Sequence, residues 1–263
     1  VPGTVHTDLI ANEIIEDPFF RLNERGVQWV DKEDWMYETT FKATPEEVAS
    51  ENQQIVFKGL DTYADVYLNH ECILRADNMH RTWTCDVKGK LREGDNLLEV
   101  YFNSPIKVDL PKYDKYDYTF NTGPDQSQNG GIFNKTLSIF ARKAGYHYGW
   151  DWGPRLVTSG IWRDIDLVTW NGLKIDNVQY VQKDVTADGK TVATKKTTLV
   201  KGLNTVTLDY TIKKPRLWWT NGLGEPYLYG FSTSVKVGDD EVSQDEEIGI
   251  RSLRLITEDD EHG

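Results

Sequence analysis

The 263-residue sequence predicts an all-β protein made of two consecutive β-sandwiches. Aromatic residues form 12% of the chain, with nine Trp and thirteen Tyr, and such residues favour strands over a helical bundle. Short runs that alternate between apolar and polar residues recur from Trp35 to Phe102, separated by turn residues, which is typical of an antiparallel sandwich. The pattern restarts after Asn171-Gly172. We therefore expect one domain over residues 1–171 and a second over 172–263.

The strands expected in the first domain are short and closely spaced. They cover residues 37–41, 54–57, 64–69, 72–74, 82–87, 96–102, 137–143 and 161–168. Strict alternation in residues 64–69 places Val66 and Leu68 on one face. Ahead of the strands, residues 7–12 are expected to form a helical turn with Thr7 as its N-cap.

The second domain has about 90 residues, the size of an immunoglobulin-like sandwich. Its expected strands cover residues 177–185, 191–199, 204–213, 229–238 and 246–257. The acidic run at 258–263 is expected to be solvated, either as a link to further chain or as a frayed terminus.

Residues 103–135 break the strand rhythm, with Pro105, Pro111 and Pro124 among polar residues. A loop of this length inside a compact domain is usually functional or disordered. Aromatic residues between Tyr113 and Phe120 argue against disorder. We expect an ordered loop that packs across one end of the sandwich.

Composition excludes several classes of function. The net charge of −12 argues against nucleic acid or an anionic membrane surface as a partner, and no apolar run is long enough to span a membrane. The five His show no metal-ligand spacing, and no phosphate-binding loop or nucleophile elbow is present, so no metal and no cofactor are expected. Cys72 and Cys85 are expected to be free, buried thiols.

The candidate site is Trp150-Asp151-Trp152, within the aromatic stretch 146–155. Flat rings can stack on the apolar face of a sugar, and a carboxylate can accept hydrogen bonds from its hydroxyls. In the alternative interpretation the two rings plug a sandwich core and Asp151 caps a turn. The position between two expected strands, beside the long loop, weakens that alternative, because binding groups usually sit on loops of a rigid scaffold. His147 either donates to a sugar hydroxyl or is satisfied within the loop.

Other candidates have simpler explanations. Asp164 and Asp166 are expected on an exposed sheet face. The acids of the long loop could form a Ca²⁺ site, but they match no metal-binding loop and are expected to be solvated; they are Asp109, Asp114, Asp117 and Asp125. Trp218-Trp219 could stack on sugar or pack one domain against another.

Four segments together resemble the β-mannosidases of glycoside hydrolase family 2. They are residues 1–9, residues 57–69, residues 143–160 with the Trp-Asp-Trp motif, and residues 215–222 with Trp218-Trp219. The resemblance covers essentially the whole chain. It implies a jelly-roll (galactose-binding-like) β-sandwich over residues 1–171, followed by an immunoglobulin-like β-sandwich over 172–263 that is short between Val185 and Thr191.

The resemblance also implies a function. In that family a catalytic (β/α)₈ barrel follows these two domains and carries the catalytic glutamates, so no catalytic residue is assigned in this chain. The Trp-Asp-Trp loop would reach into the active site of the barrel, with Asp151 on the hydroxyls of the terminal mannose and Trp150 and Trp152 beside it. The expected partners are a β-mannoside or manno-oligosaccharide substrate and the protein's own barrel. A periplasmic or secreted protein is expected rather than a cytoplasmic one.

Two alternatives remain beside this non-catalytic fragment of an exo-β-mannosidase. A free-standing carbohydrate-binding module would bind manno-oligosaccharide by itself. A purely structural sandwich would bury the rings of the loop.

Overall fold

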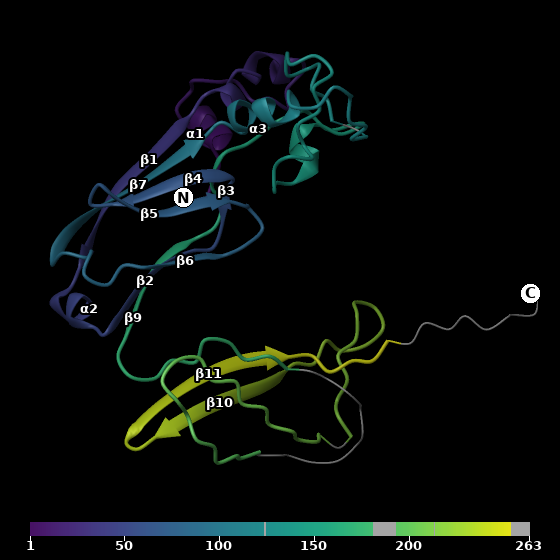
Figure 1. The fold of residues 1–263 in the computed structure, drawn as a ribbon. Helices are drawn as coiled ribbons and strands as arrows, with labels where there is room; N and C mark the ends of the chain where they lie inside the picture. Colours follow the sequence, from purple (N-terminus) through teal and green to yellow (C-terminus); the bar gives the residue numbers. More distant parts are fainter. Residues whose placement is uncertain (124, 181–192, 213, 254–263) are drawn as a thin grey trace, which may run out of the picture. The chain divides into compact units, whose positions relative to one another are not determined.

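The computed structural model describes residues 1–123, 125–180, 193–212 and 214–253. The chain divides into two compact units, residues 1–171 and residues 172–263, each of which is described by itself. The described residues are mostly strands and coil with a few short helices (Figure 1), as expected for an all-β protein.

The first unit is a β-sandwich of antiparallel sheets. A four-stranded sheet has the order β1-β7-β4-β5, a three-stranded sheet has the order β6-β2-β9, and β3 pairs with β8. The bounds of these strands are β1 Trp35–Ala43, β2 Asn52–Phe57, β3 Leu60–Asp61, β4 Tyr63–Leu68, β5 Glu71–Asp77, β6 Trp83–Asp86, β7 Gly94–Asn103, β8 Gly160–Ile161 and β9 Ile165–Trp170.

The core lies between the two larger sheets. Phe57 of β2, Val66 of β4 and Phe102 of β7 are fully buried in one cluster, so side chains from both sheets pack against each other. Alternate residues of β4 and β7 are buried, as the alternating sequence predicted.

Short helices cover one end of the sandwich (Figure 1). They are α1 Val5–Ala11, the 3₁₀ helices η1 Asn23–Val27, η2 Val30–Lys32 and η3 Gly145–Tyr148, and α3 Pro105–Tyr113; α2 Pro45–Ala49 lies between β1 and β2. Helix α1 begins earlier than expected. Its N-cap is Thr4, and Thr7 occupies the third helical position, where its hydroxyl accepts a hydrogen bond from the Thr4 N–H at 3.0 Å.

The segment 103–135 is not loop throughout, because it begins with helix α3. Ser104 caps the helix by accepting from the Lys107 N–H, and Pro105 occupies the first turn, where no N–H is needed. The expected strand at 137–143 is absent from the first unit. Leu137 and Ala141 are buried there by local turns, packed with Tyr148 and residues of α3 in a second cluster.

In the second unit, two strands are assigned among the described residues. Strand β10 Tyr229–Val237 pairs antiparallel with β11 Asp240–Ile248. The expected strand 229–238 is thus confirmed, whereas the one expected at 246–257 begins six residues earlier and ends at Ile248. The described parts of the strands expected at 177–185, 191–199 and 204–213 are coil. The shortening expected between Val185 and Thr191 lies outside the described residues.

Candidate functional site

The Trp-Asp-Trp loop is a tight turn that presents its side chains to solvent. The Trp150 N–H donates to the Gly153 carbonyl and the Gly153 N–H donates back to the Trp150 carbonyl, both at 3.3 Å. Trp152 is 87% exposed, Trp150 is 42% exposed, and Asp151 is exposed. Neither ring plugs the sandwich core, so the interpretation of this motif as core packing is wrong.

The segment that follows α3 holds the loop from one side. The Gln126 N–H donates to the Tyr148 carbonyl at 2.8 Å, and the Gln126 side-chain amide donates to the Trp150 carbonyl. Between these contacts Gly149 has a φ of 112°, and a Cβ atom there would lie 2.6 Å from Gln126 Cγ. Glycine is therefore required for this approach of the two segments.

Arg155 holds the loop from the other side. Its Nη1 donates to Asp31 Oδ2 at 2.5 Å and to Gln28 Oε1 at 2.8 Å, and the Gln28 amide donates to the Arg155 carbonyl at 2.8 Å. Both charged side chains are buried. The two ends of the loop are thus fixed, one to Gln126 and the other to the N-terminal segment around η2.

Residues that precede and follow the loop in the chain form a buried polar network with Asp61. Lys143 Nζ donates to Asp61 Oδ1 at 2.5 Å, and the Thr158 hydroxyl donates to Asp61 Oδ2 at 2.6 Å. Burial alone would raise the pKa of Asp61, but the charge and hydrogen bond of Lys143 and the Thr158 and Thr62 hydroxyls bring that pKa below its ordinary value. The carboxylate is therefore ionised, and it compensates the buried ammonium of Lys143.

His147 belongs to this network. Its Nδ1 lies 3.1 Å from Thr158 Oγ1. Because the Thr158 proton is directed at Asp61, Nδ1 must be the donor of this bond. Burial, and then the charge of Lys143, lower the pKa of His147 to about 4, so the ring is neutral near pH 7. Of the two interpretations of His147, the structure favours a histidine satisfied within the fold.

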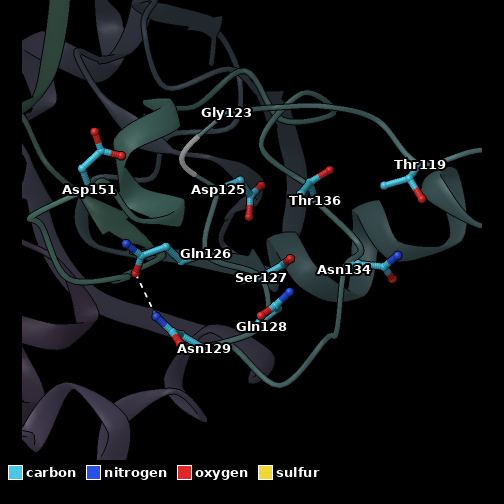
Figure 2. A pocket seen from close by; sticks show the side chains of 10 residues that line it. All are labelled: Thr119, Gly123, Asp125, Gln126, Ser127, Gln128, Asn129, Asn134, Thr136 and Asp151. Carbon is cyan, nitrogen blue, oxygen red and sulfur yellow. Dashed lines mark hydrogen bonds between the residues drawn. The ribbon is translucent and has the colours of Figure 1, made fainter.

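A polar hollow of about 450 Å³ opens beside Asp151 (Figure 2). It is lined by Thr119, Gly123, Asp125, Gln126, Ser127, Gln128, Asn129, Asn134, Thr136 and Asp151. Asp125 Oδ2 accepts from the Ser138 N–H at 3.0 Å, while its buried Oδ1 has no partner among the described residues. We did not expect this hollow from the sequence. The feature of the sequence that could have indicated it is the run Gln126-Ser127-Gln128-Asn129, which is unusually rich in amides for a packing segment.

The remaining acidic candidates, Asp109, Asp164 and Asp166, do not line the hollow. Asp164 and Asp166 form exposed ion pairs with Lys58, as expected for a solvated sheet face. Asp109 is not a solvated loop acid: it is buried in α3, where Oδ1 accepts from Tyr63 at 2.7 Å and Lys112 at 2.6 Å. No three metal-ligating side chains come together in the part of the chain that the structure describes.

In the second unit the Trp218 ring packs against Gly249, where a Cβ would lie 2.9 Å from it, and Trp219 is exposed. Trp218 therefore packs within its own unit. The thiols also differ from expectation, because Cys85 is buried but Cys72 is exposed; both are free.

The fold defines an all-β chain whose first unit is a sandwich with an anchored, exposed loop at one end. Two family models match the chain: "Glycosyl hydrolase 2 galactose-binding domain-like" over residues 1–163 and "Glycosyl hydrolases family 2" over residues 164–251. The chain belongs to glycoside hydrolase family 2. Its two domains are accordingly the galactose-binding-like sandwich and the immunoglobulin-like domain of that family.

Within this family, the chain is similar to proteins named β-mannosidase. β-Mannosidase B of Aspergillus oryzae is 34% identical over all of this chain and 33% of its own length, and that of Emericella nidulans is 32% identical over all of this chain and 34% of its own length. The crystal structure of a β-D-mannosidase from Dictyoglomus thermophilum aligns with a TM-score of 0.74 at 31% identity, covering 100% of this chain and 35% of that one. The chain spans about a third of the length of the curated relatives it matches.

A more distant structure shares the fold alone. The exo-chitosanase of Amycolatopsis orientalis has a TM-score of 0.68 at 17% identity, covering 97% of this chain and 30% of that one. Among the described residues, no helix has the length and apolar character needed to cross a membrane.

Proposed function

We propose that this chain is the N-terminal, non-catalytic part of an exo-acting β-mannosidase, and that its Trp-Asp-Trp loop forms one wall of the active site. The observation that carries the proposal is the exposed Asp151 carboxylate, set between two exposed rings on a loop fixed at both ends. Similarity to proteins named β-mannosidase along the whole chain supports the choice of substrate.

Exposed rings in this part of the first unit support a partner domain. Phe133, Tyr146, Trp150 and Trp152 are all exposed. Three of them lie within seven residues of the chain, and exposed large apolar side chains in one loop favour an interaction surface there. The proposed cover is the enzyme's own catalytic (β/α)₈ barrel, with the substrate bound between barrel and loop.

The chemistry is divided between the two parts. A retaining glycosidase uses two carboxyl groups about 5–5.5 Å apart, one as nucleophile and one as acid and base. Those groups belong to the barrel, and no residue of this chain is assigned to them. Asp151 accepts hydrogen bonds from hydroxyls of the terminal mannose, and Trp150 and Trp152 border the ring. If these hydrogen bonds tighten in the transition state, Asp151 contributes roughly 2–4 kcal/mol there.

The test is Asp151→Ala in the full-length enzyme, assayed on 4-nitrophenyl β-mannoside. A loss of 2–4 kcal/mol corresponds to a fall in kcat/KM of about 30- to 1,000-fold. Asp117→Ala is the control, because Asp117 is an exposed acid of the segment 103–135 that does not line the hollow. A fall of less than a few-fold for Asp151→Ala, with the fold intact, would contradict the proposed role.

The polar hollow favours one second candidate, a free-standing carbohydrate-binding module. Such a module would bind manno-oligosaccharide with the 263 residues alone, and calorimetry would record heat. We expect none, because the proposed site lacks its barrel half. Measurable heat would favour the binding module.

A further inference from the structure

The side chains around the hollow beside Asp151 select one kind of ligand. Its lining holds no Lys or Arg that could pair with an anion, and Asp125 and Asp151 would repel one. It holds no aromatic ring for an apolar ligand. A metal ion is equally unsuited, because no three ligating side chains converge among the described residues. What remains is a neutral ligand rich in hydroxyl groups.

The amides of the hollow suit such a ligand because each offers donors and an acceptor. Asn129 Nδ2 donates to Gln126 Oε1 at 2.9 Å (Figure 2), and Gln126 also donates to the Trp150 carbonyl. These two amides are therefore held in place and connect the hollow to the Trp-Asp-Trp loop. The side chains of Gln128 and Asn134 are exposed and make no hydrogen bond to another described residue, which leaves them available to a ligand.

The position of the hollow indicates which sugar it takes, given the proposed function. The reacting mannose must lie between the two carboxyl groups of the catalytic machinery, which this chain does not supply. Asp151, which the proposed function places on the reacting mannose, lies at one side of the hollow, and Gln128 and Asn134 lie away from it toward the other side (Figure 2). Because the hollow extends beyond Asp151, a ring held by Gln128 and Asn134 is a neighbour of the reacting ring. In an exo-acting enzyme that neighbour lies on the leaving-group side.

We infer that the hollow is a subsite for the sugar unit on the leaving-group side of the scissile bond, with Gln128 and Asn134 as its ligand-binding residues. Its volume of about 450 Å³ lies within the range of small-molecule sites. The substrate class that follows is a β-mannosyl oligosaccharide, in preference to a mannoside with an apolar aglycone.

The experiment compares two substrates in the full-length enzyme, β-1,4-mannobiose and 4-nitrophenyl β-mannoside. The readout is the ratio of kcat/KM for the first to kcat/KM for the second. Each of Gln128→Ala and Asn134→Ala should lower this ratio by about three- to tenfold, the effect of one lost hydrogen bond. Both side chains are exposed and make no hydrogen bond to another residue that the structure describes, so these variants are expected to fold normally. Gln179→Ala, an exposed amide of the second unit, is the control.

The outcomes separate this inference from the proposed function. An unchanged ratio in both variants would overturn the subsite, whether the two activities stay constant or fall together. Asp151→Ala, measured in parallel, should lower kcat/KM for both substrates. If Asp151→Ala lowers kcat/KM for neither substrate, the proposed function itself fails. If it lowers kcat/KM for both, while Gln128→Ala and Asn134→Ala leave the ratio unchanged, only the subsite is wrong.

Discussion

Asp31 and Arg155 form a buried ion pair, with Asp31 Oδ2 2.5 Å from Arg155 Nη1 and both side chains at most 3% exposed. Asp31 belongs to η2, and Arg155 follows the Trp-Asp-Trp loop by three residues. The pair therefore connects the N-terminal segment directly to the candidate site. Because both charges are out of water, Arg155 depends on Asp31 for compensation, and Asp31 depends mainly on Arg155, since its other cation, Lys32, lies farther away at 3.5 Å.

Replacing one partner should destabilise the first unit strongly. Arg155→Met is expected to lower the free energy of unfolding by about 3–5 kcal/mol, because the buried Asp31 carboxylate keeps only its longer contact with the part-exposed Lys32, at 3.5 Å. Urea denaturation measures the change. The control is Arg142→Met, which removes an ion pair with Asp77 whose side chains are 66% and 53% exposed, and it should cost less than about 1 kcal/mol. Equal losses for the two variants would contradict the role of the buried pair.

The buried histidines predict loss of stability in mild acid. Burial, and then the charge of Lys143, lower the pKa of His6 to about 4, as they do for His147. The unfolded chain binds protons at these rings near pH 6.5 and the folded chain does not, so stability is fully present above that pH and is lost as the pH falls toward 4.

Between pH 7.0 and 5.5 each histidine should contribute a loss of about 1 kcal/mol to the free energy of unfolding. The measurement is urea denaturation at the two pH values. His147→Gln should show a smaller loss than the wild type. His70→Gln is the control, because that ring is exposed on the hairpin between β4 and β5. A wild-type stability that is flat over this range would contradict the buried neutral rings.

Strand positions in the first unit could be predicted because one face of each strand is buried, and burial leaves an alternating pattern. Residues 64–69 and 96–102 show it clearly. Helix α3 could not be predicted from the sequence because its prolines suggest a loop. Pro105, however, lies in the first turn, where proline is tolerated. The strand predicted at residues 137–143 is wrong because turns bury Leu137 and Ala141. A short apolar run in the sequence does not distinguish such buried turns from a strand.

The chemistry of the candidate site could be predicted in part. Trp150-Asp151-Trp152 is conspicuous locally, and its exposure agrees with a loop on a scaffold. The residues that hold the loop leave no local pattern, because the hydrogen bonds join positions far apart: Gln126 with Trp150, and Asp31 with Arg155. Such pairs follow from the fold, and only the structure brings them together.

The two thiols should differ in reactivity. Burial, and then the neighbouring Cys72, raise the pKa of the Cys85 thiol to about 11, whereas Cys72 is exposed on β5. Ellman's reagent should modify one thiol per native chain within minutes and the second only in denaturant. Cys72→Ser should abolish the native reaction. Two rapidly reacting thiols in the native wild type would show that Cys85 is accessible.

The contact between Gly149 and Gln126 predicts a selective effect of one added methyl group. Gly149→Ala places a Cβ 2.6 Å from Gln126 Cγ, at a φ of 112° that alanine disfavours, so the two segments must move apart. We expect a loss of about 1–3 kcal/mol in the free energy of unfolding. Gly145→Ala is the matched control, because no atom lies within 4 Å of its added Cβ, and the change there should stay within about 0.5 kcal/mol. If both variants unfold at the same urea concentration, Gly149 does not determine how closely Gln126 approaches the loop.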